Sequence, residues 1–491
     1  MSSQTNVGAA VEEAPFSMKA IMGPMMAIVV GMIMVILDST VMNIALPTLM
    51  SDFDSTVNTM QWSITAYTLA LSAVIPLAGW LTDRFGAKQV FLITIFLFTA
   101  GSILCSFATT PEQLIIYRII QGVGGGMVQP IGMAIIFKLA PPNKQGAVMG
   151  MLGIPMMLGP ALGPVLGGYL LEYATWHWIF LINLPIGIIA IMVGLRYLPK
   201  VERKSVPALD FWGMLLAPIA FATLSYAVSE GGKDWGSTNT IVSLIVGGVA
   251  LVLFIIVELL HKQPLLELRV FGSSDFTIGI FASWLMTMAL FGSFLFVPMY
   301  MQQVFHYEPL KTGFMILPQV AMTGLFMPIG GKLFDKFGAR VVSVVGIGFI
   351  AAGLFYMSQI HADSGAGYVI TATMIMGVGM GLSMMPVNTH ILKVAPRKLV
   401  GRVTPLVSAA QQVVVSFAIA GLASYMGNRI EDHMAATKGD AAVSLVSAFG
   451  DTFLVAGCIA VAGALLAILL RRPKVAEEDA GEAVNAPVMM H

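Results

Sequence analysis

The ten residues GWLTDRFGAK (residues 79–88) return later in the chain as GKLFDKFGAR (residues 331–340), and this repeat decides the fold. Glycine, leucine, aspartate, phenylalanine, glycine and alanine match in place, and both basic positions of the first copy stay basic in the second. Each copy follows an apolar segment that is long enough to cross a bilayer as a helix. The repeat therefore predicts a chain built from two similar halves, with both copies on the same side of a membrane.

The composition agrees with a protein that resides in the lipid bilayer. Of the 491 residues, 57% are hydrophobic and only 11% are charged, and the mean hydropathy is +0.85, whereas soluble domains carry about 25% charged residues. The formal net charge of zero argues against nucleic acid as a partner. Cys105 and Cys458 both lie in apolar segments, so no disulfide framework is predicted.

A hydropathy window of about 19 residues divides the chain into fourteen apolar segments. We expect each to be a helix, because a helix satisfies its own backbone hydrogen bonds in lipid. The predicted spans are 20–46, 59–81, 89–108, 112–137, 146–171, 176–198, 210–229, 240–260, 276–302, 312–334, 341–358, 366–392, 403–428 and 449–470.

Basic residues set the orientation of these spans, because cytoplasmic loops are rich in Lys and Arg. Of the 26 Lys and Arg residues, only Lys233, Lys311, Arg429 and Lys438 fall in loops predicted to be outside, and Arg118 lies within a span. A missed helix would reverse every later loop and destroy this alternation. We therefore expect a multi-pass protein of the cell (plasma) membrane with both termini in the cytoplasm.

The position of the repeat divides the chain. It follows the second and the tenth span, so the chain is predicted to contain two six-helix halves with an inserted helix pair between them. The predicted fold is therefore all-α. This is the layout of an alternating-access carrier whose site lies between the halves. We expect this carrier to be a monomer. The predicted parts are a cytoplasmic tail (1–19), the N-terminal half (20–200), the inserted seventh and eighth helices (201–270), the C-terminal half (271–472) and a disordered cytoplasmic tail (473–491).

Two charged residues lie deep inside predicted spans, Asp38 in the first and Arg118 in the fourth. A charge at the bilayer centre costs at least ~3 kcal/mol, so such residues are candidates for function. Burial favours the protonated form of an isolated carboxyl group, whereas a nearby guanidinium favours the carboxylate. A carboxyl group that moves between these environments would bind and release a proton. The alternative for Arg118 is a structural pair with a helix end or a carbonyl group.

Four motifs in order resemble those of the major facilitator superfamily, in particular its fourteen-helix drug:proton antiporter family. They are LDSTVMNIALP (residues 37–47), the inner-loop motif at residues 79–88, RIIQGVGGG (residues 118–126) and GIPMMLGPALGPVLGG (residues 153–168). The segment WHWIFLINLPIG (residues 176–187) follows, also as in that family, except that His177 stands where an arginine is usual. The resemblance covers nearly the whole chain and implies secondary active transport.

The inner-loop repeat is predicted to latch one conformation of the rocking halves, since its aspartate can accept hydrogen bonds at a helix end and its basic residues can pair with acids on neighbouring helices. The alternative is simple positive-inside anchoring. The predicted gating residues are Gly79, Asp83, Arg84, Gly86, Lys88, Asp335, Lys336 and Arg340.

The fifth span combines small residues with proline, which permits close helix contact and bending. Ordinary tight packing is one explanation, and the resemblance to antiporters adds a second, a seal against proton leak. The residues concerned are Gly153, Pro155, Gly159, Pro160, Gly163, Pro164 and Gly167.

A few polar residues within the spans are candidates for an amphipathic substrate pocket, although interhelical hydrogen bonds are the alternative. They are Asn43, Gln61, Tyr67, Gln121, Gln129, Gln302, Gln319, Asn388 and Gln411. The 35 methionines suit either a pocket that repacks around varied ligands or ordinary helix interfaces.

The predicted function is export of lipophilic, cationic drug-like molecules in exchange for protons. The alternative is a dedicated exporter of one lipid, antibiotic or metabolite. The chain has no phosphate-binding loop of the ATPase type and no clustered metal-binding pattern. We therefore expect no enzymatic activity, no catalytic residues, no metal and no cofactor, with the proton gradient as the energy source.

Overall fold

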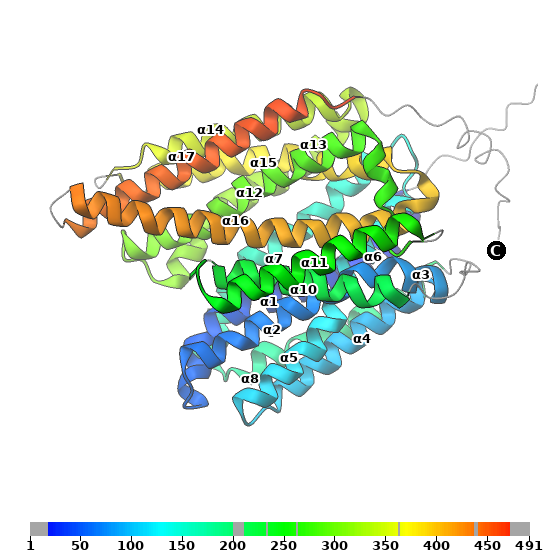
Figure 1. Ribbon diagram of the computed structural model, residues 1–491, viewed down its shortest axis with the longest axis horizontal. Coiled ribbons are helices and arrows are strands. Elements are labelled where there is room, and N and C mark those ends of the chain that lie inside the picture. Colours follow the sequence, from blue (N-terminus) through cyan, green and yellow to red (C-terminus); the bar gives the residue numbers. More distant parts are fainter. Residues whose placement is uncertain are drawn as a thin grey trace, which may run out of the picture.

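A computed structural model describes residues 18–199, 211–231, 234–261, 264–361, 364–436 and 440–471, and every regular element in these ranges is a helix (Figure 1). The elements, with 3₁₀ turns written η, are α1 (Met18–Asp52), α2 (Val57–Val74), η1 (Ile75–Leu77), α3 (Ala78–Phe85), α4 (Ala87–Ser106), α5 (Pro111–Gly125), α6 (Val128–Leu139), α7 (Gln145–Tyr173), α8 (His177–Leu181), α9 (Asn183–Tyr197), α10 (Phe211–Gly231), α11 (Thr238–Leu260), η2 (Leu268–Gly272), α12 (Ser274–Gln303), α13 (Pro309–Phe337), α14 (Ala339–Ser358), α15 (Ala366–Val394), η3 (Arg397–Leu399), α16 (Val400–Ala436) and α17 (Ala441–Ala467).

Twelve helical stretches in the described residues are long and apolar enough to cross a membrane. Several combine consecutive elements, such as Thr59–Phe85, which joins α2, η1 and α3, and Pro111–Leu139, which joins α5 and α6. The count confirms an all-helical membrane fold but not the fourteen spans expected from the sequence. The two remaining predicted spans correspond to α7, some of whose side chains lie outside the described residues, and to α10, whose apolar part is the shorter Trp212–Val228.

The two copies of the repeated loop have the same local geometry. Gly86 joins α3 to α4 with a φ of 91°, and Gly338 joins α13 to α14 with a φ of 82°. Residues with a Cβ atom rarely adopt such positive φ angles, so glycine is required at both positions. A single glycine therefore links α3 to α4, and another links α13 to α14, with a sharp change in the direction of the chain.

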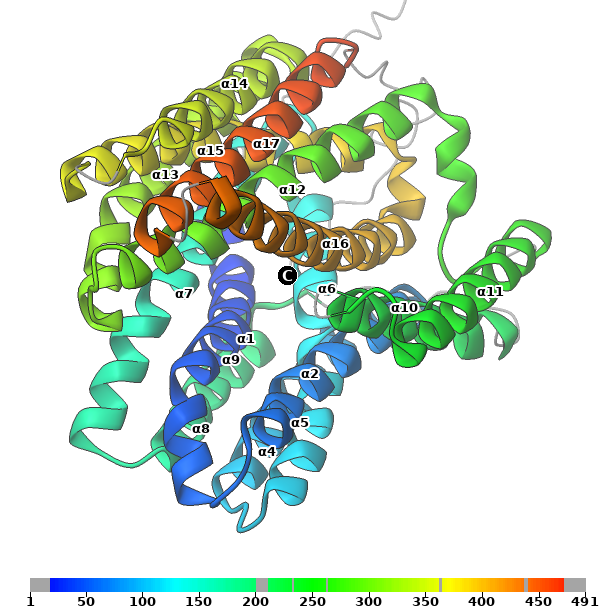
Figure 2. The same ribbon diagram turned by 60° about the vertical axis from the view of Figure 1, so that its left-hand side comes forward.

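The helices form two groups that meet along a seam (Figure 2). Helices α1 to α9 form one group and α12 to α17 form the other, and α7 packs along α13 where the groups meet. The pair α10 and α11 lies to one side, where α10 contacts both α2 and α16. We call the end of the bundle that carries residues 79–88 and 331–340 the motif end.

Much of one predicted outer loop is helical. The hydropathy pattern leaves residues 429–448 outside the spans, but α16 continues to Ala436 and α17 begins at Ala441. Charged residues such as Arg429 and Asp432 lower the hydropathy of this segment without interrupting the helix. Of the two predicted tails, 1–19 and 473–491, residues 1–17 and 473–491 lie outside the described residues.

Candidate functional site

Asp38 and Arg118 are in contact in the N-terminal group of helices. Nη1 of Arg118 on α5 lies 2.5 Å from Oδ2 of Asp38 on α1. Only 2% of Asp38 and 1% of Arg118 is exposed. The two charged residues that stand out within the spans therefore form one buried ion pair, which is the contact that the proton-binding hypothesis requires.

Two side-chain amides complete the surroundings of the Asp38 carboxylate. Nε2 of Gln121 donates to Oδ1 at 2.7 Å, and Nδ2 of Asn183 donates to the same oxygen at 3.0 Å. These three partners of the Asp38 carboxylate are all N–H donors. A carboxylate can only accept hydrogen bonds, so each of these donors is matched by an acceptor site on one of the two Asp38 oxygens.

The guanidinium group of Arg118 has further partners of its own. Its Nη1 donates to Oε1 of Gln121 at 2.7 Å, and its Nε donates to the carbonyl oxygen of Ser63 at 3.3 Å. The guanidinium carbon lies 3.9 Å from the centre of the Tyr67 ring. Tyr67 and Gln121, predicted as substrate candidates, thus belong to the ion-pair cluster.

Asn183 is a member of the cluster that the sequence analysis does not single out. Its Nδ2 also contacts the hydroxyl oxygen of Ser102 on α4, at 2.9 Å, so it links α9 to both α1 and α4. The signal that could have found it is an amide inside the apolar segment that follows residues 153–168, where an unpaired polar group would be costly.

The glycines of α7 allow that helix to press against the face of α1 that carries Ile36 and Thr40. A Cβ atom on Gly159 would lie 2.3 Å from Cγ2 of Ile36, and one on Gly163 would lie 2.0 Å from Oγ1 of Thr40. Gly167 also lies close to α1, since a Cβ atom on it would be 3.0 Å from Cγ1 of Val41, which is tighter than an ordinary van der Waals contact. The side chains of Pro155, Pro160 and Pro164 lie outside the described residues.

The other end of α7 approaches α13 across the seam. A Cβ atom on Gly150 would lie 2.8 Å from the carbonyl oxygen of Met327, and one on Gly153 would lie 2.2 Å from the Met327 sulfur. Helix α7 therefore contacts the ion-pair helix in its own half and the repeat-carrying helix of the other half.

The aspartates of the two repeats both bind the opposite half at the motif end. Asp335 accepts hydrogen bonds from the backbone N–H groups of Gly146 (3.0 Å) and Ala147 (2.9 Å) at the start of α7. Asp83 accepts a hydrogen bond from Nε of Arg402 on α16 at 3.2 Å. One repeat thus caps a helix and the other forms an ion pair.

Lys88 and Arg340 occupy equivalent positions and bind equivalent partners. Nζ of Lys88 donates to the carbonyl oxygens of Leu195 and Leu198, at 2.7 and 2.8 Å, where α9 ends. Nε of Arg340 donates to the carbonyl oxygen of Leu470, at 2.9 Å, just after α17. The last basic residue of each repeat therefore holds the final helix of its own half.

The remaining predicted gating residues lie around these contacts. Arg84 and Lys336 are exposed. A Cβ atom on Gly79 would lie 2.8 Å from the carbonyl oxygen of Gly401, so this glycine permits the close approach of α3 and α16.

A cavity of about 130 Å³ lies on the seam between the two halves. It contains three of the predicted substrate candidates: Gln129 on α6, Asn388 on α15 and Gln411 on α16. These residues come from both halves, as expected for a site that alternating access exposes first to one side and then to the other.

The other substrate candidates do not converge on this cavity. Gln319 is buried and its Nε2 lies 3.5 Å from the sulfur of Met380, which agrees with the interhelical alternative. Gln61 and Gln302 are exposed, and the side chain of Asn43 lies outside the described residues.

A two-half helical bundle with a seam cavity and a buried ion pair defines a membrane transporter rather than an enzyme. The sequence profile of the Major Facilitator Superfamily matches residues 28–419. The chain therefore belongs to the Major Facilitator Superfamily.

Known relatives agree with this assignment. The chain is 36% identical over 390 residues to the multidrug resistance protein B homolog of Mycobacterium tuberculosis (strain ATCC 25618 / H37Rv), covering 78% of this chain and 72% of the relative. It is 31% identical over 444 residues to the lincomycin resistance protein LmrB of Bacillus subtilis (strain 168), covering 89% and 93%. It is 33% identical over 376 residues to the riboflavin transporter RibZ of Clostridioides difficile (strain 630), covering 75% and 80%.

Solved structures share the fold. The proton:xylose symporter XylE, bound to 6-bromo-6-deoxy-D-glucose, superimposes with a TM-score of 0.65 at 15% identity, covering 95% of this chain and all of the other. The human organic anion transporter MFSD10 gives a TM-score of 0.63 at 14% identity, covering 89% and 99%. At these identities the likeness concerns the fold alone.

Proposed function

We propose that this protein is a proton-driven exporter of amphipathic organic molecules in the plasma membrane. The observation that carries the proposal is the buried Asp38 carboxylate, which is held by Arg118, Gln121 and Asn183 without solvent contact. A carboxyl group this enclosed changes its proton only when the surrounding helices move. Proton binding and helix movement are thereby coupled.

The coupling step is the loss of the ion pair. A proton on Asp38 removes the negative charge that balances Arg118, and a buried charge without its partner costs about 3–5 kcal/mol. The cluster would then rearrange until Arg118 regains a partner or meets water. The return of the carboxylate would restore the arrangement described above.

Contacts through α7 supply a route from the ion pair to the seam. Asp38 lies on α1 between Ile36 and Thr40, the two residues against which Gly159 and Gly163 pack. The same helix begins at the N–H groups that Asp335 caps. A shift of α1 would therefore be transmitted through α7 to the contacts between the halves.

We assign the motif end to the cytoplasm, because basic residues concentrate there. The two halves are joined at this end by the Asp83 and Asp335 contacts, and by hydrogen bonds from Lys393 to the carbonyl oxygen of Pro142 and from Arg397 to that of Lys138. The arrangement corresponds to a carrier closed toward the cytoplasm. We also count α7 and α10 as spans, which gives fourteen helices with both termini cytoplasmic.

A dedicated exporter of one metabolite is the second candidate. Its support is the relative named as a riboflavin transporter, which is as similar to this chain as several relatives named for drug resistance. Transport of one compound alone from a panel of unrelated antibiotics, dyes and flavins would favour this function over multidrug export.

The test of proton coupling is transport in proteoliposomes with an imposed pH gradient. We expect the unchanged protein to move a fluorescent substrate against its gradient, and the Asp38→Asn variant to show none of this uphill transport while it still inserts and folds. Gln302→Leu, a change at an exposed position outside the cavity, is the control. Full uphill transport by Asp38→Asn would refute the proposal.

A further inference from the structure

The seam cavity has a lining of unusual chemistry for a pocket that is expected to bind cations. Four residues with amide side chains, Gln129, Asn388, Gln411 and Gln412, line it together with Thr404 and Ser408. The rest of the described lining is aliphatic, methionine, glycine or proline: Ile75, Gly126, Pro130, Met133, Met156, Met384, Met385, Leu392 and Val407.

Neither of the usual means of holding a cation is found among these lining residues. No carboxylate and no aromatic ring belongs to the described lining. An organic cation bound here would therefore lose its hydration without gaining an ion pair or a cation–π contact. Asp38 cannot act as the counter-ion of a bound cation, because both of its oxygens accept hydrogen bonds from Arg118, Gln121 and Asn183. It is also almost fully buried.

Two of these amides are oriented by neighbouring groups. Nδ2 of Asn388 donates to the carbonyl oxygen of Met384 at 3.0 Å. The amide of Gln411 lies between two hydroxyl groups of α12: it donates to Oγ1 of Thr287, and its Oε1 accepts from Ser283 at 3.4 Å. Amides fixed in this way offer both donors and acceptors at set positions, which favours a ligand with a matching polar edge.

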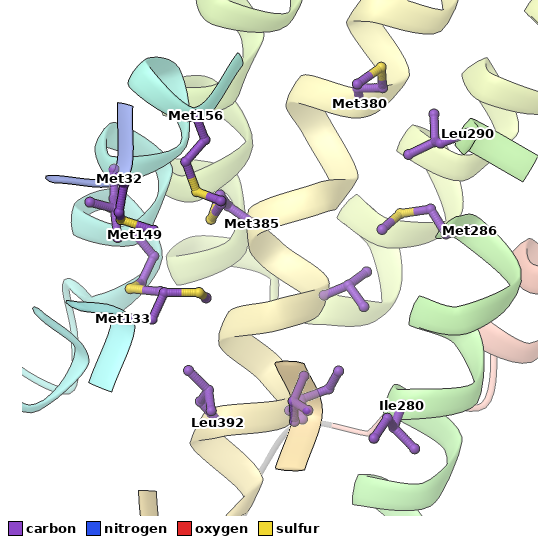
Figure 3. Packing of buried hydrophobic residues seen from close by; sticks show 14 of the residues in the cluster. Met32, Met133, Met149, Met156, Ile280, Met286, Leu290, Met380, Met385 and Leu392 are labelled. Carbon is purple, nitrogen blue, oxygen red and sulfur yellow. The ribbon is translucent and has the colours of Figure 1, made fainter. Parts of the chain in front are cut away.

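The methionines come from both halves and meet at the cavity. Figure 3 shows Met133 and Met156 on helices of the N-terminal half, pointing toward Met385 and Leu392 on α15. Thioether sulfurs are polarisable and make favourable contacts with aromatic rings. This part of the lining suits the flat face of a ring system.

We propose that the cargo of this cavity is an uncharged, planar molecule with a hydrogen-bonding edge, recognised by the amides at its edge and by the methionines at its faces. The inference rests on the proposed function, whose site it specifies. It replaces the cationic cargo expected from the sequence with a neutral one.

Two tricyclic fluorescent probes of similar size test this inference on the purified full-length protein. Both are larger than the cavity of about 130 Å³, so each must bind a conformation in which the halves have moved further apart at the seam. Lumichrome is neutral and carries amide-like N–H and C=O groups on one edge, whereas proflavine is a cation at neutral pH. In a fluorescence titration we expect lumichrome to bind at least about tenfold more tightly, because a buried charge without a partner easily costs that factor. Equal or tighter binding of proflavine would overturn the inference, and so would the absence of lumichrome binding.

Substitutions of Gln129 locate the binding and test the role of charge. Gln129→Leu should weaken lumichrome binding about fivefold by removal of one hydrogen-bonding group. Gln129→Glu introduces a carboxylate into the cavity and should increase proflavine binding. The exposed Gln302→Leu, outside the cavity, should change neither affinity. If both Gln129 variants bind lumichrome as tightly as the unchanged protein does, the ligand binds elsewhere and the inference is contradicted.

The Asp38→Asn variant separates this inference from the proposed function. Since Asp38 does not line the cavity, the variant should keep the preference for lumichrome while it loses proton-driven transport. A protein that prefers proflavine but still depends on Asp38 for uphill transport would refute the neutral cargo alone. A protein that prefers lumichrome and transports uphill without Asp38 would refute proton coupling alone.

Discussion

At the scale of the residue, the proposed proton coupling depends on how completely Asp38 is enclosed. Three side chains from α5 and α9 donate to its carboxylate, and Arg118 is in turn held by Gln121, by a backbone carbonyl and by the Tyr67 ring. Hydrogen bonds to an ionised group are worth about 1.5–3 kcal/mol each. Together they make this carboxylate an integral part of the N-terminal half in the conformation described.

The first prediction concerns Asn183. Asn183→Leu removes one donor to Oδ1 of Asp38 and should lower the rate of proton-driven transport roughly tenfold, since the lost hydrogen bond is worth about that factor. Transport rates in proteoliposomes measure the effect, with Gln61→Leu at an exposed position as the control. A rate equal to that of the unchanged protein would show that Asn183 does not position the carboxylate.

The sequence identifies most members of this cluster but not their contact. Asp38 and Arg118 stand out because charges in an apolar span are costly, and Tyr67 and Gln121 are found as polar candidates. They lie on three different helices, and hydropathy says nothing of which helix faces point at each other. Asn183 is missed because a single amide in an apolar segment gives a weak signal until its partners are known.

At the scale of the element, α7 is the helix that connects the functional parts. Its glycines pack against Ile36 and Thr40 of α1 and against α13 at the seam, and its first N–H groups bind Asp335. The periodic glycines predict tight packing. The sequence alone does not reveal that one helix contacts both the helix that carries Asp38 and the other half.

The second prediction compares two glycines of this helix. A Cβ atom on Gly163 would lie 2.0 Å from Oγ1 of Thr40, whereas one on Gly168 would meet no atom within 4 Å. Gly163→Ala should therefore lower the thermal stability and the transport rate, by an overpacking cost of about 1–3 kcal/mol. Gly168→Ala is the matched control and should be neutral or stabilising, because alanine favours helix by up to about 1 kcal/mol.

Thermal unfolding in detergent and transport in proteoliposomes measure both variants. The same melting temperature for Gly163→Ala and Gly168→Ala would contradict the proposed contact between α7 and α1.

The third prediction concerns the cap at the start of α7. Asp335→Asn removes the charge that the two N–H groups and the helix dipole stabilise, at a cost of about 1 kcal/mol. The population open at the motif end should then increase about fivefold. Spin labels on cysteines introduced at the exposed positions Arg84 and Lys336 report the distance between the halves.

Asp432→Asn changes an exposed charge on α16, outside the motif end, and serves as the control for this measurement. An unchanged distance distribution in Asp335→Asn would show that the cap does not hold the halves together.

At the scale of the whole molecule, the repeat predicts the two-half architecture correctly, and hydropathy finds most of the helices. Hydropathy does not predict the end of a helix where the helix continues beyond its apolar part. The charged end of α16 remains helical beyond its apolar part, so much of the predicted loop at residues 429–448 is helical. The chemistry of the seam cavity could not be predicted either, because its lining combines residues of α6, α7, α15 and α16 that are distant in the sequence.

The halves meet in two layers that have different roles in this account. Charged and backbone groups join them at the motif end, while amides and methionines face each other in the cavity. The ion pair lies in neither layer and acts through α1 and α7. Under the proposed function, the proton site is separate from the cargo site, so the two compete only through the conformation of the bundle.

Proton release on ligand binding tests this central claim most directly. The purified protein, in weakly buffered detergent solution with a pH-sensitive dye, is mixed with lumichrome at a pH where uphill transport is half-maximal. The account predicts that the unchanged protein releases protons in proportion to the ligand bound, and that Asp38→Asn binds lumichrome but releases none. Equal proton release by the two proteins would contradict the assignment of Asp38 as the proton-coupling residue.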